Sequence, residues 1–324
     1  MSGALLRAEG LAHRYRTQGR VLHALRDVSL EVAEGETLGI VGESGCGKST
    51  LARLLVGLEV PTEGRVTLGG LPVSAQDRAG RLRVARLTQL VFQSPYASLN
   101  PRHRVGSILH EPLEIHGVGT RAQRDRDVGR LVQRVGLPAD VLGRFPHELS
   151  GGQRQRVAIA RALALKPKVL VADEPVSALD VSVQAQILNL LAELRAEFSL
   201  ALVFVSHDLR VVRWLSDRVM VLYHGRVVES GPTLEVLDTP LHPYTQLLAA
   251  SVPGRVRQAL DRVVHEPPSP FELGAGCAFR PRCSLAEERC GREQPLTVGA
   301  QRRLACWTVS AEAPPTTQSV SSDA

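Results

Sequence analysis

Two glycine-rich stretches of this 324-residue chain have the composition of phosphate-binding loops. The first, GESGCGKST at 42–50, matches the pattern G-x-x-x-x-G-K-[ST]. It follows an apolar run and precedes a segment with helical spacing, which is the context that such a loop requires. Its glycines allow backbone N–H groups to face phosphate oxygens, and the helix that follows adds the positive end of its dipole. We therefore expect this loop to bind a nucleoside triphosphate.

Each position of this loop has an expected task. Lys48 is suited to reach the β- and γ-phosphates, and the Ser49 hydroxyl is suited to bind Mg²⁺. Cys46 is expected to pack passively within the loop. The candidate nucleotide-binding residues are Gly42, Ser44, Gly45, Cys46, Gly47, Lys48, Ser49 and Thr50.

A pair of carboxylates at 173–174 supplies the second part of a nucleotide-hydrolysing site. The stretch VLVADEP at 169–175 is apolar up to Ala172 and then acidic, as expected at the end of a buried strand. Asp173 is suited to hold Mg²⁺ through water, and Glu174 to orient and deprotonate the attacking water as general base. The alternative, an acidic pair that merely caps a helix, is less favoured once the phosphate loop is accepted.

The second glycine-rich stretch, LSGGQRQ at 149–155, raises the question of whose phosphate it holds. Ser150, Gly151, Gly152 and Gln153 open a segment with helical spacing. A helix N-terminus presents free N–H groups and a positive dipole end, which favour an anion. One chain thus has two candidate phosphate sites about a hundred residues apart.

The overall composition limits the class of protein. The 39 basic residues are scattered among 33 acids, without a dense basic run interleaved with aromatics, so the net charge of +6 does not favour nucleic acid binding. The apolar runs are shorter than the ~18–20 residues of a membrane helix, and Met1–Gly10 lacks the apolar core of a secretory signal. We expect a cytosolic protein, whose membrane work would need other subunits.

The elements that must position these residues can be read from periodicity. Residues 1–40 indicate strands with a turn at Glu34–Gly35, and 61–75 indicates a further hairpin. Helices are expected after the phosphate loop, with Leu51, Leu54, Leu55 and Leu58 on one face, and over 121–137, with Thr120 as N-cap. The runs at 168–173 and 200–207 are typical of buried parallel strands. The segment DRVMVLYHGRVVESG predicts two strands with a turn at His224–Gly225.

Taken together, GESGCGKST, LSGGQRQRVAIARAL, VLVADEP, SALD and VSHD have the order and spacing found in ATP-binding cassette (ABC) transporter ATPases. The chain resembles this family over roughly 5–240. The resemblance implies that Gln93 links the metal site to membrane partners, and that Asp180 lies in a loop that crosses a dimer interface. It further implies that His207 contacts the γ-phosphate and that Tyr15 stacks on adenine.

The resemblance also answers the question of the second loop. In the family, two chains stack head to tail, and each LSGGQ loop closes on the γ-phosphate of the ATP held by the other chain. It implies a RecA-like P-loop α/β core with an N-terminal antiparallel β-subdomain. The expected boundaries are a cassette at 1–240 with a helical subdomain at 94–165, a C-terminal extension at 241–307 and a disordered tail at 308–324.

The segment DTPLHPYTQLLAASVP at 238–253 narrows the resemblance to ATPases of dipeptide/oligopeptide permeases, and most to their second, dipeptide permease F-type ATPase subunit. This implies a paralogous ATPase partner, two membrane permeases and an extracytoplasmic binding protein, with this chain peripheral on the cytoplasmic side of the membrane. The cargo is inferred from kinship alone. Nickel, glutathione and oligosaccharide import remain alternatives, as does a soluble ATPase outside transport.

Four cysteines gather near the C-terminus. Cys277, Cys283, Cys290 and Cys306 have the spacing C-x5-C-x6-C-x15-C, and the resemblance implies that some relatives hold a cluster at such cysteines. Four thiolates in a cytosolic chain suit a [4Fe–4S] cluster or zinc, and the long spacings favour the cluster over zinc. The alternative is four reduced thiols packed in a small lobe.

Overall fold

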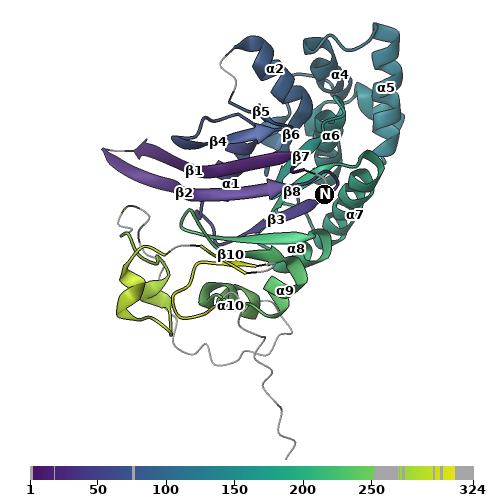
Figure 1. Ribbon diagram of the computed structural model, residues 1–324. Coiled ribbons are helices and arrows are strands. Elements are labelled where there is room, and N and C mark those ends of the chain that lie inside the picture. Colours follow the sequence, from purple (N-terminus) through teal and green to yellow (C-terminus); the bar gives the residue numbers. More distant parts are fainter. Residues whose placement is uncertain are drawn as a thin grey trace, which may run out of the picture.

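The computed structural model describes residues 3–17, 19–74, 77–251, 269, 271, 274–294, 296–299 and 302–310. Two sheets form its centre (Figure 1). The smaller has the order β2-β1-β4-β5 and is antiparallel, with strands β1 (Leu6–Thr17), β2 (Arg20–Val32), β4 (Glu63–Leu68) and β5 (Leu71–Pro72). This confirms the N-terminal antiparallel subdomain and the hairpin at 61–75.

The larger sheet has the order β11-β12-β10-β9-β3-β8-β7-β6. Its central strands are parallel: β6 (Thr88–Val91), β7 (Val169–Asp173), β8 (Ala201–Val205), β3 (Thr37–Val41) and β9 (Arg218–Tyr223). Strands β3, β7 and β8 are entirely buried, which explains why their sequences are uninterrupted apolar runs. The turn predicted at Glu34–Gly35 is present, but it carries the chain from the small sheet into the large one.

Strand β9 continues through a tight turn into β10 (Arg226–Pro232), as the sequence predicts. His224 and Gly225 have φ values of 44° and 76°, the left-handed backbone of a two-residue hairpin turn. The Gly225 N–H donates to the Cys46 carbonyl at 2.9 Å, so this turn also supports the phosphate loop.

Helix α1 (Lys48–Leu55) lies between the two sheets. Leu51, Leu54 and Leu55 are buried in a core shared by both sheets, whereas Leu58 lies beyond the helix end and is 58% exposed. The predicted apolar face is therefore correct for three of its four leucines. Helix α2 (Arg78–Leu87), which the sequence pattern did not predict, precedes β6.

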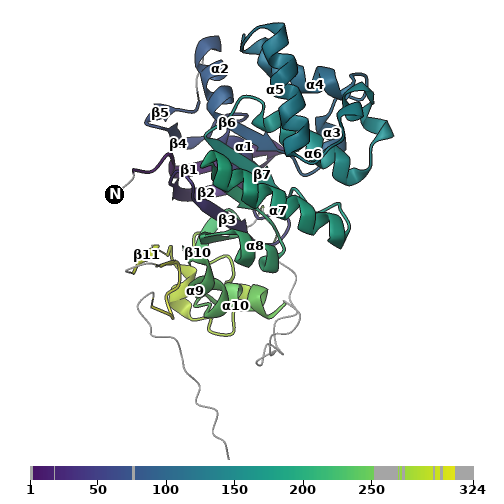
Figure 2. The ribbon, with the colours of Figure 1, turned by 90° about the vertical axis from the view of Figure 1, so that its right-hand side faces the viewer.

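The helical region between β6 and β7 stands at one end of the molecule (Figure 2). It contains α3 (Pro95–Ser98), α4 (Val105–Ile115), α5 (Arg121–Arg134), the 3-10 turns at 139–143 and 146–148, and α6 (Gly151–Leu163). Thr120 caps α5 as predicted: its side chain accepts from the Gln123 N–H, and Gln123 Oε1 accepts the Thr120 N–H in return. Helices α7 (Val181–Phe198) and α8 (Leu209–Leu215) follow β7 and β8.

The chain after β10 returns to the large sheet. Helices α9 (Thr233–Asp238) and α10 (Pro243–Ala250) precede a small lobe, which we call the cysteine lobe (274–310), with 3-10 turns at 280–282 and 288–291 and strands β11 (Thr297–Val298) and β12 (Arg303–Leu304). Strand β12 pairs with β10, so the lobe extends the sheet of the cassette (Figure 1). The predicted linker at 253–276 lies almost wholly outside the described residues, as does most of the predicted disordered tail.

His242 provides a pH-sensitive contact where α10 begins. It is buried, and its Nδ1 accepts the Tyr244 N–H at 3.0 Å. Burial lowers its pKa to about 4, from 6.5 in an unfolded chain. Because the folded state favours the neutral imidazole, His242 contributes to the free energy of unfolding. This contribution is fully present above pH 6.5 and is lost as the pH falls toward 4.

We expect the free energy of unfolding to fall by about 2 kcal/mol between pH 7 and pH 5 because of His242 alone. The His242→Asn variant keeps a side-chain acceptor at the N-cap but does not titrate, so its loss over this range should be smaller by that amount. Urea unfolding of both proteins at pH 7, 6 and 5 measures the difference. Parallel pH profiles would show that His242 does not contribute.

Candidate functional site

The phosphate loop leaves the end of β3 and runs into α1, so its backbone turns around a space at the edge of the large sheet. Gly42 and Gly47 have φ values of 155° and 106°. A Cβ at Gly42 would lie 2.2 Å from the Leu222 carbonyl oxygen, and one at Gly47 would lie 2.4 Å from that of Ala24. Only glycine fits at these two positions, because both neighbours are backbone atoms.

Lys48 is buried, and its ammonium points back across the loop. Its Nζ donates to the carbonyl oxygens of Gly42 at 2.8 Å and Glu43 at 2.9 Å. Cys46 is also buried, and burial raises the pKa of its thiol, which favours the neutral form. This agrees with the prediction that Cys46 packs passively.

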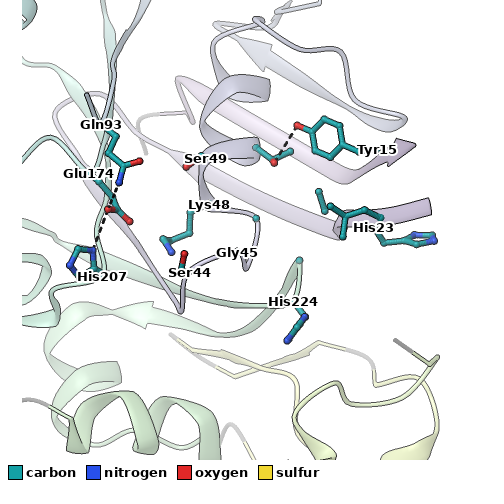
Figure 3. Close-up of a pocket in the computed structure, with 15 residues that line it drawn as sticks. Tyr15, His23, Ser44, Gly45, Lys48, Ser49, Gln93, Glu174, His207 and His224 are labelled. Carbon is teal, nitrogen blue, oxygen red and sulfur yellow. Dashed lines mark hydrogen bonds and ion pairs between the residues drawn. The ribbon is translucent and has the colours of Figure 1, made fainter. Parts of the chain in front are cut away.

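A cavity of about 680 Å³ opens beside the loop (Figure 3). The sequence predicted ten of the residues that line it: Tyr15, Ser44, Gly45, Gly47, Lys48, Ser49, Thr50, Gln93, Glu174 and His207. Leu22, His23, Ala24, His224 and Gly225 complete the lining, and they were not predicted. These five come from β2 and from the β9–β10 turn, whose sequences carry no recognisable motif.

Three polar side chains from different elements meet at one side of the cavity. The Gln93 Nε2 donates to Glu174 Oε2 at 3.0 Å, and the His207 Nδ1 lies 3.3 Å from the same oxygen (Figure 3). Gln93 follows β6, Glu174 follows β7 and His207 follows β8, so three neighbouring parallel strands deliver them. Glu174 has a φ of 45°, a left-handed backbone that is uncommon outside glycine and typical of functional positions.

Asp173 ends β7 just before Glu174 and lies deeper. It is buried, and its Oδ1 has no hydrogen-bond partner among the described residues. Burial raises its carboxyl pKa, and a hydrogen bond from Ser49 opposes the shift. A buried carboxylate oxygen without a partner beside a serine hydroxyl is a donor set that suits Mg²⁺.

Tyr15 lies at the other end of the cavity from Glu174 (Figure 3). Its hydroxyl donates to Glu59 Oε2 at 2.5 Å and lies 3.3 Å from the Thr50 hydroxyl. Burial raises its pKa. Burial lowers the pKa of both His23 and His224, because it disfavours the charged imidazolium. These two rings therefore favour the neutral form near neutral pH.

The LSGGQ segment does not contribute to the lining of this cavity. Ser150 caps α6: its hydroxyl accepts the Gln153 N–H at 3.2 Å, and Gln153 Oε1 accepts the Ser150 N–H at 3.0 Å. Ser150 and Gly151 are exposed. Asp180 caps α7 in the same manner, accepting the Val183 N–H at 2.9 Å, which lowers its pKa.

Comparisons with known proteins agree with this geometry. The family described as "ABC transporter" matches 25–177, and "Oligopeptide/dipeptide transporter, C-terminal region" matches 228–290. A probable peptide ABC transporter ATP-binding protein of Sinorhizobium fredii is 50% identical over 94% of this chain and 90% of that protein. The chain belongs to the ABC transporter family of ATPases. Within it, the di/tripeptide transport ATP-binding protein DppF of Pseudomonas aeruginosa is 48% identical (88% of this chain, 90% of that one).

Solved ABC cassettes share the fold. The ATP-binding cassette MJ0796, in a dimeric post-hydrolysis state bound to ADP and Pi, superposes with a TM-score of 0.65 at 31% identity, over 70% of this chain and 98% of that one. The expectation of a RecA-like ABC ATPase is thereby confirmed. Among the described residues, no helix is both long enough and apolar enough to cross a membrane.

The four C-terminal cysteines lie in the cysteine lobe as free thiols. Burial raises the pKa of Cys277 to about 11, and the nearby Cys283 and Cys290 contribute to the shift. Among the described residues, no three His, Cys, Asp or Glu side chains form a group that could hold a metal ion. The predicted iron–sulfur cluster or zinc ion therefore has no support in this arrangement.

Proposed function

We propose that this chain is the ATP-hydrolysing subunit that energises import of di- and oligopeptides through a membrane ABC permease. The observation that carries the hydrolytic part is the convergence of Gln93, Glu174 and His207 on one side of the cavity beside the phosphate loop. The names of the relatives and the match to the oligopeptide/dipeptide transporter region support the cargo class.

In this proposal the loop residues 42–50 bind the phosphates of ATP. Lys48 exchanges its present bonds to two loop carbonyls for the β- and γ-phosphate oxygens, and the N-terminus of α1 adds its dipole. Ser49, Asp173 and Gln93 would hold Mg²⁺, which neutralises developing charge on the phosphates when bound. Tyr15 packs its ring against the adenine, at the end of the cavity away from Glu174.

Glu174 acts as general base toward the attacking water, within the same hydrogen-bonded group as Gln93 and His207. Gln93 orients the Glu174 carboxylate, and His207 is placed to contact the γ-phosphate. Because Gln93 is hydrogen-bonded to Glu174, a shift of the segment that carries Gln93 would change the position of the Glu174 carboxylate. This is how membrane partners that contact the segment after β6 would influence hydrolysis.

The LSGGQ segment, with Ser150, Gly151, Gly152 and Gln153, serves the ATP of a second subunit. Its absence from the cavity lining and the dimeric state of the similar MJ0796 cassette support this. Asp180 lies at the interface in this arrangement. ATP then joins two cassettes, and loss of the γ-phosphate lets them separate.

The proposed partners are a paralogous ATPase subunit, two membrane permeases and, indirectly, an extracytoplasmic binding protein. The chain would lie at the cytoplasmic side of the membrane. We propose the cassette at 1–240, its helical subdomain at 94–165 and the extension at 241–307 as functional units. The test is reconstitution of the full complex in liposomes, with ATP hydrolysis measured against peptides, nickel, glutathione and oligosaccharides. Stimulation by a solute other than a peptide would overturn the cargo.

The cysteine lobe is left without a metal in this proposal. Iron, zinc and acid-labile sulfide analysis of protein purified without oxygen tests that assignment. Stoichiometric iron and sulfide would restore the cluster predicted from the sequence, and a colourless, metal-free, stable preparation would leave four packed thiols.

A further inference from the structure

An ion pair joins the cysteine lobe to the phosphate loop. Arg282, in the 3-10 turn at 280–282, donates from one guanidinium nitrogen to Glu43 Oε2 at 2.9 Å and from the other to Glu43 Oε1 at 3.0 Å. Glu43 is the second residue of the phosphate loop, 239 positions earlier in the chain. The two-pronged geometry fixes both the distance and the orientation of the carboxylate.

The arginine of this pair is almost fully buried. Arg282 is 9% exposed, and it also donates to the Tyr223 hydroxyl at 3.4 Å. Tyr223, Tyr244 and Phe279 form an aromatic group with ring centroids 4.4–5.5 Å apart beside it. The Glu43 hydrogen bond raises the pKa of Arg282, so the guanidinium stays charged. Arg282 is the more deeply buried partner, since the Glu43 side chain is 33% exposed, and breaking the pair leaves one of the two charges without its partner.

Glu43 is held from three sides. Its N–H donates to the Tyr244 hydroxyl at 2.8 Å, its carboxylate binds Arg282, and its carbonyl oxygen accepts Lys48 Nζ at 2.9 Å. Glu43 therefore connects Arg282 directly to Lys48, the lysine proposed to reach the phosphates. In addition, Arg282 neutralises an anion that stands next to the place where the polyanionic ATP binds.

We propose that Arg282 is a positioning residue for the nucleotide site: it fixes Glu43 and neutralises its charge, so that docking of the cysteine lobe sets the affinity for ATP. The inference rests on the proposed role of 42–50 as the ATP-binding loop. It gives the C-terminal extension a direct task in the ATPase, although none of the extension's described side chains lines the cavity.

Four variants test whether the charge of Arg282 matters. Arg282→Gln leaves the Glu43 carboxylate unpaired near the phosphates, and we expect the Kd and KM for ATP to rise about tenfold while kcat at saturating ATP stays within about twofold. Glu43→Gln leaves a cation instead, so its Kd should rise less. The double variant should bind ATP more tightly than Arg282→Gln, and Arg282→Lys should recover part of the affinity.

A matched control is available because a second arginine also ties the cysteine lobe to the cassette. Arg302 donates to the buried Glu229 of β10, far in sequence from the phosphate loop, and to the Thr239 carbonyl. Arg302→Gln and Arg282→Gln should both lower the melting temperature, but Arg302→Gln should leave the Kd for ATP unchanged. Calorimetric titration of each intact protein with ATP and Mg²⁺ provides the Kd.

The possible outcomes distinguish a failure of the proposed role of Arg282 from a failure of the proposed ATPase function. Wild-type affinity in Arg282→Gln would overturn the inference, and so would an equal loss in Arg302→Gln, because the effect would then come from loosening of the lobe in general. If the wild type itself bound no ATP, the proposed function and the inference would fall together.

Discussion

Replacing Glu174 by Gln should stop turnover while leaving ATP bound. The substitution preserves the size of the side chain and its contacts with Gln93 and His207 but removes the basicity of the carboxylate. Loss of a general base costs typically 10²–10⁴-fold, and we expect a fall in kcat of about a thousandfold. The Kd for ATP should change little, because the phosphate loop and Asp173 are untouched.

The Glu174→Gln variant should also accumulate as an ATP-bound dimer. If ATP joins two cassettes and hydrolysis separates them, blocking hydrolysis traps the joined state. Size-exclusion chromatography with ATP and Mg²⁺ measures this, with the paralogous ATPase included because the natural dimer is proposed to be mixed. His207→Ala is the comparison variant, since it removes a partner of Glu174 but leaves the carboxylate. Turnover of the Glu174→Gln variant near the wild-type rate would remove Glu174 from the role of base.

The parts of this site that follow strands were predictable from sequence. A buried parallel strand is an uninterrupted apolar run, and its carboxyl end is marked by the first polar residue, so the amino-acid pattern alone places Asp173, Glu174 and His207 at strand ends. The phosphate loop can be recognised in the sequence because its backbone requires glycine at fixed positions. Adjacent strands then bring Gln93, Glu174 and His207 together.

Contacts that depend on packing between distant segments were not predictable. His23 and His224 line the cavity because β2 and the β9–β10 turn approach the loop. The turn at His224–Gly225 was predicted, but neither sequence indicates that its segment approaches the phosphate loop. Arg282 reaches Glu43 across 239 residues, and one arginine among many gives no sequence signal. The cysteines show the opposite case, in which a suggestive spacing is not matched by a metal-binding arrangement of the described side chains.

The second large effect is expected at Gly151, where a carboxylate would separate folding from function. Gly151 is the first residue of α6 and is exposed, and its nearest neighbour for an added Cβ is Leu179 Cδ2 at 3.2 Å. An acidic residue in the first turn stabilises a helix through the dipole. The Gly151→Asp variant should therefore melt at or above the wild-type temperature, and its own phosphate loop should bind ATP normally.

Turnover should nevertheless fall about a hundredfold. In the proposed dimer, the new carboxylate would face the γ-phosphate of the partner subunit's ATP, at a place where N–H groups would stabilise that phosphate. ATP-dependent dimerisation should weaken in parallel. Ala122→Asp is the matched control, since it adds the same charge to the first turn of α5, at a helix outside the proposed interface. It should keep full ATPase activity, which shows that a negative charge at a helix start is harmless in itself.

The pairing of these readouts decides between a site completed by two subunits and one completed within a single chain. The Ser150–Gly151 end of α6 contributes nothing to the cavity beside the phosphate loop, so a self-sufficient site predicts that the Gly151→Asp variant hydrolyses ATP as the wild type does. A shared site predicts normal ATP binding without turnover. Full activity of Gly151→Asp, in a preparation where Lys48→Ala is inactive, would contradict the shared site and leave the LSGGQ helix without a phosphate to hold.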